Sequence, residues 1–229
     1  LSNFISPRQE EESAYLLPVA DFDPSKFLVV VTRRGKVKRM RLGIFARVNR
    51  LGVKAMGIGK GDEIVSAQIA KEEDDLIIVN KQGKAIRFAV GTIRAQSRAG
   101  GGVRGMKLDP EDQVVASAVA HPDRHLLLLT DLGYGKFLAI PVIPQQHRGG
   151  KGVKVITLNP KNGNLVAAAT VSDPSASQQK ILILSQRGQA FPHWIKDISV
   201  QKRNRRGMQI AKLDAPDKVI GLTVMDPEG

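Results

Sequence analysis

The chain has 229 residues, 42% of them hydrophobic, which is enough for one large or two small domains with a buried core; no apolar run reaches the ~18–20 residues that a membrane-spanning helix needs. Cysteine is absent, which excludes disulfides and thiolate metal sites, and aromatic residues are too few, at 4%, for base stacking on single strands to be the main mode of binding. The net charge of +13, from 35 basic and 22 acidic residues, indicates a polyanionic partner, with nucleic acid first and no membrane.

The first element along the chain is an apolar run that leads through a glycine turn into a second strand. It begins at Phe27 and turns at Gly35, and aliphatic and β-branched residues on both sides of such a turn are typical of a β-hairpin. The pattern returns around three further turn glycines, Gly83, Gly133 and Gly188. Four hairpins are therefore predicted. No sustained helical periodicity is present, so little helix is expected beyond single turns at 42–46 and 194–199.

A basic loop follows each hairpin and ends in Gly-Val or Gly-Met at the start of another strand. The last glycines of the loops are Gly52, Gly102, Gly152 and Gly207, so successive copies are 50, 50 and 55 residues apart. A polar turn leading into a short strand completes each copy, and an isolated copy of that strand at 12–19 opens the chain. The repeats fall at about 12–61, 62–111, 112–163 and 164–229.

Repeats of this length, with several short strands each, predict an all-β, propeller-like fold of four complete four-stranded blades in a single domain. Each blade would bury its apolar faces against its neighbours. Because the basic loop occupies the same place in every blade, the loops are expected to line one rim. A curved body with such a rim could bend a long polyanion around itself.

Cations and glycines in and beside these loops are the candidate DNA-binding residues. Arg and Lys supply charge-assisted hydrogen bonds to phosphate, and glycine lets the backbone approach a phosphate closely. The richest loop and the strand after it contribute Gln146, His147, Arg148, Gly149, Gly150, Lys151, Gly152 and Lys154. The other copies contribute Arg47, Arg50, Arg98, Arg104, Arg203, Arg205 and Arg206. Four lysines behind the hairpin turns could face either the rim or solvent: Lys36, Lys38, Lys84 and Lys136.

No catalytic or metal site is expected. The four histidines do not cluster at metal-ligand spacing, and the Pro-Asp pair between His121 and His125 indicates a turn rather than a helix face. No pair of carboxylates stands alone in an apolar context, as general acid–base catalysis needs. The glycine-rich segment 99–105 lacks the Gly-Lys-Ser/Thr of a nucleotide-binding loop. We therefore expect a non-catalytic chain that binds no cofactor.

Several segments together resemble the C-terminal domain of DNA gyrase A. They are the loop 146–152, the hairpin turn 132–136, the segment 102–105 with Leu108 after it, and the Asp-Ile-Ser segment 197–199. The resemblance covers essentially the whole chain. It implies a β-pinwheel, a propeller-like disc of six blades with strand exchange between them. The domain would wrap duplex DNA around its basic rim, so that a type IIA topoisomerase introduces negative supercoils.

The resemblance also implies partners and a location. The expected partners are duplex DNA, the remainder of gyrase A, and gyrase B, in the cytoplasm and associated with the nucleoid. ATP and Mg²⁺ would be bound by other domains or subunits of the parent enzyme, and not by this chain.

The sequence departs from the family pattern at points that leave alternatives open. The family's seven-residue box usually has Arg at its second position, where this chain has His147, and the box usually lies in the first blade rather than the third. Four repeats are visible instead of six, so the sequence is either a fragment without the first two blades or a divergent relative. The alternative functions are those of the C-terminal domain of topoisomerase IV, in its gyrase-A-like subunit, which selects substrate topology, and of a propeller that docks an acidic protein.

Overall fold

The computed structural model describes residues 17–47 and 54–225, and its regular structure is almost entirely β. Of the sequence predictions, Arg50 and most of the leading segment 12–19 lie outside the described residues. The helices of the described part are short 3-10 turns: η1 (Leu42–Phe45), η2 (Val90–Thr92), η3 (Ile140–Val142), η4 (Pro174–Ala176) and η5 (Ile195–Asp197). The first and last confirm the two predicted single turns. None of these helices is long enough to cross a membrane.

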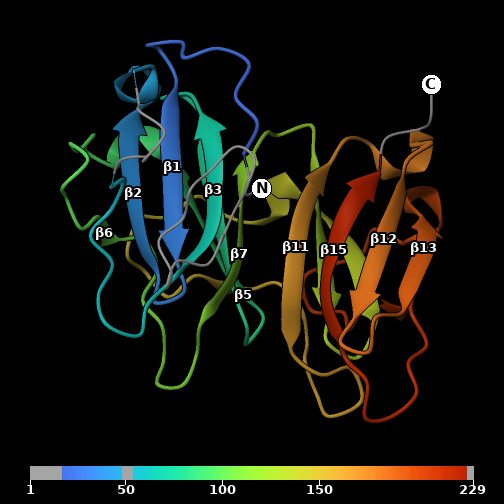
Figure 1. The fold of residues 1–229 in the computed structure, drawn as a ribbon. Helices are drawn as coiled ribbons and strands as arrows, with labels where there is room; N and C mark the ends of the chain where they lie inside the picture. Colours follow the sequence, from blue (N-terminus) through green and yellow to red (C-terminus); the bar gives the residue numbers. More distant parts are fainter. Residues whose placement is uncertain (1–16, 48–53, 226–229) are drawn as a thin grey trace.

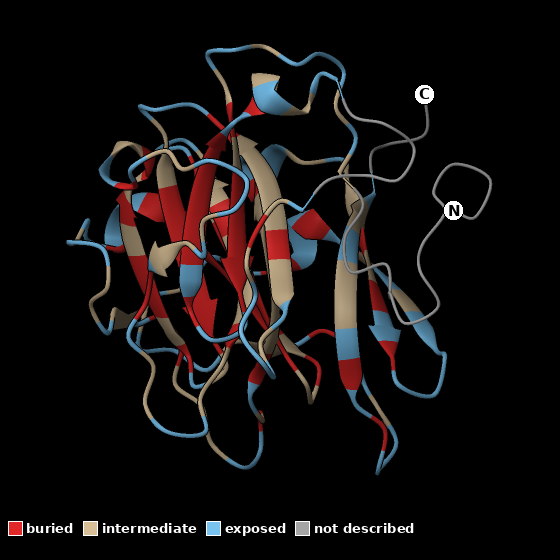
Figure 2. Cartoon of the chain, turned by 60° about the vertical axis from the view of Figure 1, so that its left-hand side comes forward, coloured by how far each residue is buried: buried red, intermediate tan, exposed pale blue. Residues whose placement is uncertain are grey.

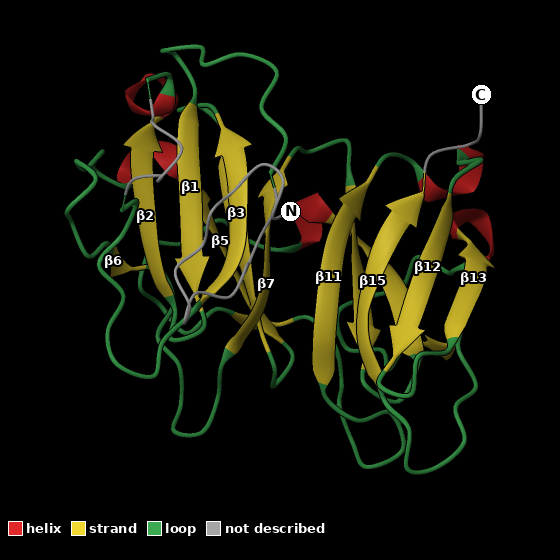
Figure 3. Ribbon diagram, viewed as in Figure 1, coloured by secondary structure: helices red, strands yellow, loops and turns green. Residues whose placement is uncertain are grey.

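Four antiparallel sheets, one around each predicted hairpin, make up the fold (Figures 1 and 3). The first has the order β3 (Ile64–Ala70), β1 (Phe27–Thr32), β2 (Lys36–Arg41), β6 (Val103–Arg104). The second has the order β7 (Val114–Ala120), β4 (Asp75–Asn80), β5 (Lys84–Ala89), β10 (Val153–Lys154). The third has the order β11 (Leu165–Val171), β8 (His125–Thr130), β9 (Tyr134–Ala139), β14 (Met208–Gln209). The fourth has three strands among the described residues, where the sequence predicts four: β15 (Val219–Met225), β12 (Lys180–Ser185) and β13 (Ala190–Trp194).

The first strand in each of these orders lies innermost, and the innermost strands pack side by side. β3 contacts β7, β7 contacts β11, and β11 contacts β15. Figure 1 shows all four between the hairpin of the first sheet and that of the fourth. The sheets are thus arranged like propeller blades. In Figure 2 the buried residues concentrate in the strands, while the connecting loops are mostly exposed.

The core lies between neighbouring sheets, and alternate residues of one strand belong to different parts of it. Leu76 and Ile78 of β4 are in the core shared with the first sheet, whereas Ile77 and Val79 are in the core shared with the third. Side chains alternate between the two faces of a strand, so a strand buried on both faces reads as a continuous apolar run. The uninterrupted apolar runs of the sequence therefore mark the strands that sit between two neighbours.

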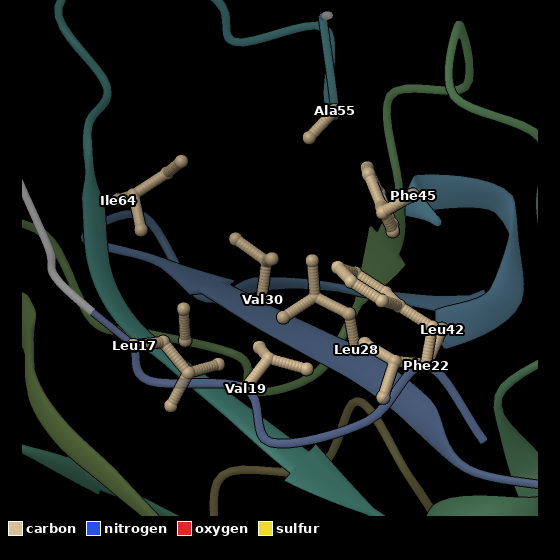
Figure 4. Close-up of a pocket in the computed structure, with 10 residues that line it drawn as sticks. Leu17, Val19, Phe22, Leu28, Val30, Leu42, Phe45, Ala55 and Ile64 are labelled. Atoms are coloured by element: carbon tan, nitrogen blue, oxygen red, sulfur yellow. The ribbon is translucent and has the colours of Figure 1, made fainter. Parts of the chain in front are cut away.

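The outer face of the first sheet carries a small apolar cluster of its own. Val30 and Met40 are buried there together with Met56. Segment 17–22 crosses this face and helps to line an apolar pocket, in which Figure 4 shows Leu17, Val19 and Phe22 beside Leu28 and Val30. Residues 17–19 form no strand, so the described end of the leading segment covers the sheet without joining it.

The short outer strands β6, β10 and β14 come from the next repeat along the chain. In the first sheet, Val103 of β6 lies opposite Val37 of β2. The exchange is completed by main-chain hydrogen bonds onto the turn glycines of the hairpins. The N–H of Gly105 donates to the carbonyl of Gly35 at 2.8 Å. In the same way the N–H of Val155 donates to the carbonyl of Gly83, and the N–H of Ile210 to the carbonyl of Gly133, both at 2.9 Å. The first three sheets thus take their hairpin from one repeat and their inner and outer strands from the next, and the basic loops 96–102, 146–152 and 201–207 come to lie between neighbouring sheets.

Candidate nucleic-acid interface

Three seven-residue loops of one design connect the 3-10 turns to the exchanged strands. They span 96–102, 146–152 and 201–207, and they follow η2, η3 and η5. Each begins with glutamine, has arginine at its third position and ends in glycine. The copy in the first repeat lies largely outside the described residues, but its Arg47 is described and exposed.

In the loops 96–102 and 201–207 the glutamine that begins the loop also closes it, a role that the sequence analysis did not predict. The N–H of Gln96 donates to the carbonyl of Arg39 at 2.9 Å, and the side-chain Oε1 accepts from the N–H of Gly102 at 3.1 Å. In the last loop, Oε1 of Gln201 accepts from the N–H of Gly207 at 3.2 Å. A glutamine six residues before the last glycine recurs in all three loops, and this repeated spacing in the sequence could have indicated a structural role for it.

Main-chain hydrogen bonds place the three loops in a row. The segment that follows one loop donates an N–H to the carbonyl of the fifth residue of the next loop. The donor and acceptor pairs are Gly57 to Gly100 (3.3 Å), Lys107 to Gly150 (2.9 Å) and Thr157 to Arg205 (3.1 Å). The three donors are 50 residues apart, so one geometry repeats from sheet to sheet. The loops therefore lie along one rim, as their position in the repeat predicts.

Most of the predicted cations on this rim are exposed to solvent. The exposed residues are Arg47, Arg98, Arg104, His147, Arg148, Lys151, Lys154, Arg205 and Arg206. The half-buried ones are Gln146, Gly149, Gly150, Gly152 and Arg203. Lys54 is also exposed, and with Ser97, Arg98 and Ala99 it lines a hollow on the rim. It stands 50 residues before Arg104, so the repeat itself could have identified this residue.

Two cations of the middle loop are engaged within the protein. One Nη of Arg148 donates to the carbonyl of Arg104 at 2.9 Å, which leaves the other guanidinium donors available. The Lys151 amine lies 2.7 Å from a carboxylate oxygen of Asp109, whose other oxygen accepts from Lys84 at 2.8 Å. Hydrogen bonds from Lys151 and Lys84 lower the pKa of Asp109 to about 2, so the carboxylate stays ionised. Lys151, which the sequence predicts to be a DNA contact, thus already forms an ion pair with Asp109.

The lysines behind the hairpin turns fall into two groups, which corrects the expectation that all four face the rim or solvent. Lys36 is exposed and Lys84 is half-buried, but Lys38 and Lys136 are 0% exposed. The buried amines point beneath the rim and hydrogen-bond to main-chain carbonyls there. Burial lowers the pKa of Lys136 to about 8 and also lowers that of Lys38.

No group of three or more histidine or acidic side chains is placed to hold a metal ion in residues 17–47 and 54–225. His125 begins β8, whereas His121 precedes the turn before that strand, with its Nδ1 3.9 Å from a carboxylate oxygen of Asp74.

Comparison with known sequences identifies relatives of the chain. A family model described as the DNA gyrase C-terminal domain, beta-propeller, matches residues 26–71, 74–121, 124–172 and 195–224. The DNA gyrase A protein of Chlamydia pneumoniae is 32% identical over 217 residues, which cover 94% of this chain and 26% of that protein. The DNA gyrase A protein of Dehalogenimonas lykanthroporepellens is 33% identical over 100 residues, covering 44% of this chain and 12% of that protein. The chain thus spans about a quarter or less of these relatives.

Two solved structures have the same arrangement of sheets. The structure of a DNA gyrase A C-terminal domain superposes with a TM-score of 0.87 at 28% identity, covering 98% of this chain and 74% of that one. A topoisomerase IV C-terminal domain also gives a TM-score of 0.87, covering 98% of this chain and 69% of that one, but at 19% identity it shows the fold alone. These matches confirm the resemblance that the repeated hairpins and loops indicate.

Proposed function

Because the chain belongs to the DNA gyrase C-terminal domain family, we propose that it wraps and bends duplex DNA along its rim of basic loops. The parent type IIA topoisomerase would use the wrapped duplex to introduce negative supercoils. One observation carries this proposal: three loops stand in a row, joined by main-chain hydrogen bonds, and each has an arginine at its third position. The chain acts by binding alone, and the chemistry belongs to other parts of the enzyme.

The energy for bending comes from contacts to phosphate. Smooth bending of 20–30 base pairs through 40–90° costs on the order of 1–6 kcal/mol. Each neutralised phosphate releases counterions, so several loops contacting one duplex can offset that cost. Contacts that arginines and main-chain N–H groups make to phosphate carry no information about the bases. Binding should therefore tolerate many sequences and weaken steeply with salt.

The partners follow from the same proposal. They are duplex DNA, the remainder of gyrase A, and gyrase B, with the complex in the cytoplasm on the nucleoid. ATP and Mg²⁺ would be held by other domains or subunits of that complex.

A topological experiment tests wrapping directly. Nicked circular DNA is incubated with increasing amounts of the protein, ligated, and freed of protein, and the linking number of the products is read from a gel. We expect a shift of one sign that grows with protein and then saturates, because a duplex coiled around a fixed rim traps writhe of one hand. An unrelated basic protein of similar net charge serves as the control.

An unshifted distribution of linking numbers would contradict wrapping. If the protein also bound DNA no better than the control, the rim would be better explained as a docking surface for an acidic protein. Sequence-tolerant binding without a shift in linking number would support DNA binding by the rim but contradict wrapping.

A charge-removing substitution beside the middle loop should strengthen binding. In Asp109→Asn, the Lys151 amine loses its carboxylate partner, now 2.7 Å away, and the rim gains one unit of positive charge. We expect the affinity for a long duplex to rise several-fold, and the slope of log K against log salt to steepen by up to about 0.9. The measurement is a salt titration of binding by fluorescence anisotropy.

The matched control for this prediction is Asp123→Asn, which makes the same charge change at an exposed turn outside the loops. It should alter affinity much less, because the change lies outside the rim. Equal effects from the two variants would mean that only the net charge matters and that the pairing of Lys151 does not.

A further inference from the structure

The side chain of Lys136 is the most deeply buried cation beneath the last loop. It comes from β9 in the third sheet, is 0% exposed, and reaches across to the loop 201–207. Its amine donates to three main-chain carbonyls, of Lys202 (2.8 Å), Arg203 (3.1 Å) and Arg205 (3.1 Å). An ammonium group has three donors, and here all three are used within one loop.

Lys38 has the same arrangement two sheets earlier. It comes from β2, is 0% exposed, and donates to the carbonyls of Ala55 (2.6 Å), Arg98 (2.8 Å) and Gly100 (2.7 Å). In both cases the amine binds the carbonyls of the third and the fifth loop residue. Two independent copies of one contact indicate a built feature of the fold rather than an accident of packing.

Without a cation these carbonyls would bring the negative ends of several peptide dipoles together in a buried place. The carbonyl of the fifth loop residue also accepts a main-chain N–H, but that of the third residue, Arg98 or Arg203, has no other donor among the described residues, and a buried acceptor that loses its donor is destabilised. The loop should therefore hold its observed curl only while the amine is present.

The direction of these carbonyls also decides where the neighbouring N–H groups point. In a trans peptide the C=O of one residue and the N–H of the next point in opposite directions. Carbonyls that face the buried amine thus turn the N–H groups of Ala99 and Gly101, and of Asn204 and Arg206, away from it. Among the described residues none of these four N–H groups has a hydrogen-bond acceptor. They are free to donate to a ligand beside exposed arginines.

The middle loop is held differently. Its counterpart of Lys38 and Lys136, three residues after the hairpin glycine, is Ile86, which is fully buried and offers no donor. That loop is held instead by the guanidinium of Arg148 on the carbonyl of Arg104, and by the N–H of Gly149 on the carbonyl of Gly105 at 2.7 Å. The described part of the chain therefore contains basic loops with a buried lysine beneath them and one without, and the two kinds can be compared within one protein.

We propose that Lys38 and Lys136 are positioning residues, which hold the loops 96–102 and 201–207 so that outward main-chain N–H groups bind phosphodiester oxygens of duplex DNA. Neither lysine touches the DNA itself. The ligand in this proposal rests on the proposed function, whereas the positioning of the loops does not. The middle loop, without a buried amine, relies on its side-chain cations for the same contact.

The test uses Lys136→Met in the whole chain, because methionine fills a similar volume without a donor. Amide hydrogen exchange without DNA should be at least about tenfold faster at the hydrogen-bonded amides of Gln201, Arg205 and Gly207 and unchanged in 96–102 and 146–152, since about 1.4 kcal/mol of lost local stability is a factor of ten. Affinity for a duplex should fall about tenfold with an unchanged salt slope, whereas Arg203→Ala should lower the slope by about 0.9. The control is Ile86→Met, which should alter neither exchange nor affinity.

Three outcomes would overturn the proposal: unchanged exchange in 201–207, faster exchange spread over the whole domain, or a loosened loop with unchanged affinity. If Lys136→Met does not fold, Lys38→Met gives the same comparison at 96–102. A further measurement needs no variant: adding duplex should slow exchange of the amides at 99, 101, 204 and 206, and unchanged exchange in a DNA-bound sample would also overturn the proposal. If the protein binds no DNA, the proposed function fails, but the exchange data still test the positioning.

Discussion

Replacing the arginine at the third position of every described loop, in the triple variant Arg98→Ala, Arg148→Ala, Arg203→Ala, should nearly abolish wrapping. If each arginine neutralises about one phosphate, as the proposed function requires, each lost contact lowers the salt slope by about 0.9, so the slope should fall by about 2.7. At about tenfold per charge-assisted contact, affinity at low salt should fall between about 100- and 1000-fold. Arg98 and Arg148 are exposed and Arg203 half-buried, and the bond from Arg148 to the carbonyl of Arg104 holds only its own loop, so we expect little change in the free energy of global unfolding.

A charge-matched control separates the rim from net charge. The variant Lys71→Ala, Arg187→Ala, Lys218→Ala also removes three exposed cations, but none lies in the loops. It should change the salt slope much less and leave the linking shift in ligated circles intact. If both triple variants weakened binding equally, the loops would not be the DNA-binding surface.

The second large effect is expected on stability, at the turn glycine of the third hairpin. Gly133 has φ +78°, and a Cβ there would overlap the main-chain carbonyl of Ala211, which belongs to the segment that follows the exchanged strand β14. A non-glycine residue in this left-handed region costs about 1–2 kcal/mol, and the displaced strand adds to that cost. We expect Gly133→Ala to lower the free energy of unfolding by about 3–5 kcal/mol, measured by urea titration.

The fourth hairpin provides the control for Gly133. Gly188 occupies the same position with φ +80°, but nothing described lies within 4 Å of a Cβ added there. Gly188→Ala should therefore cost about 1–2 kcal/mol, the backbone term alone. The difference between the two variants measures how tightly an exchanged strand is pressed against the hairpin that accepts it. Equal losses would mean that the close approach to Ala211 relaxes at no cost.

The sequence predicted the hairpins and the order of the loops because both are local. A turn glycine between two apolar runs specifies its own hairpin. In each turn a side-chain oxygen four residues back accepts the N–H after the glycine, as Thr32 does for Lys36 at 3.2 Å and Asn80 does for Lys84 at 2.7 Å. The 50-residue spacing then fixed the place of each basic loop in its blade, and repeated cations such as Arg104 and Lys154 could be read from it.

Other features depended on residues that are distant in the sequence. The Lys151 amine meets Asp109 across 42 residues, and the Lys136 amine meets the carbonyl of Arg205 across 69. Lys36 and Lys38 are the same residue type two positions apart, yet Lys36 is exposed and Lys38 is buried. Strand alternation places both on the same face of β2, so the deciding factor is the loop of another sheet above Lys38.

The sequence by itself determined the hairpins and the periodic placement of positive charge, since each hairpin is encoded in one short segment and the basic loops recur at a regular spacing. Only the tertiary structure decided which cations face solvent, which one a carboxylate holds, and which lie beneath the rim as buried donors. Burial and pairing are properties of the space between sheets, and strand exchange builds that space from two successive repeats. Whether a lysine there is a buried donor depends on the main-chain carbonyls around its amine, and only folding brings those carbonyls to it.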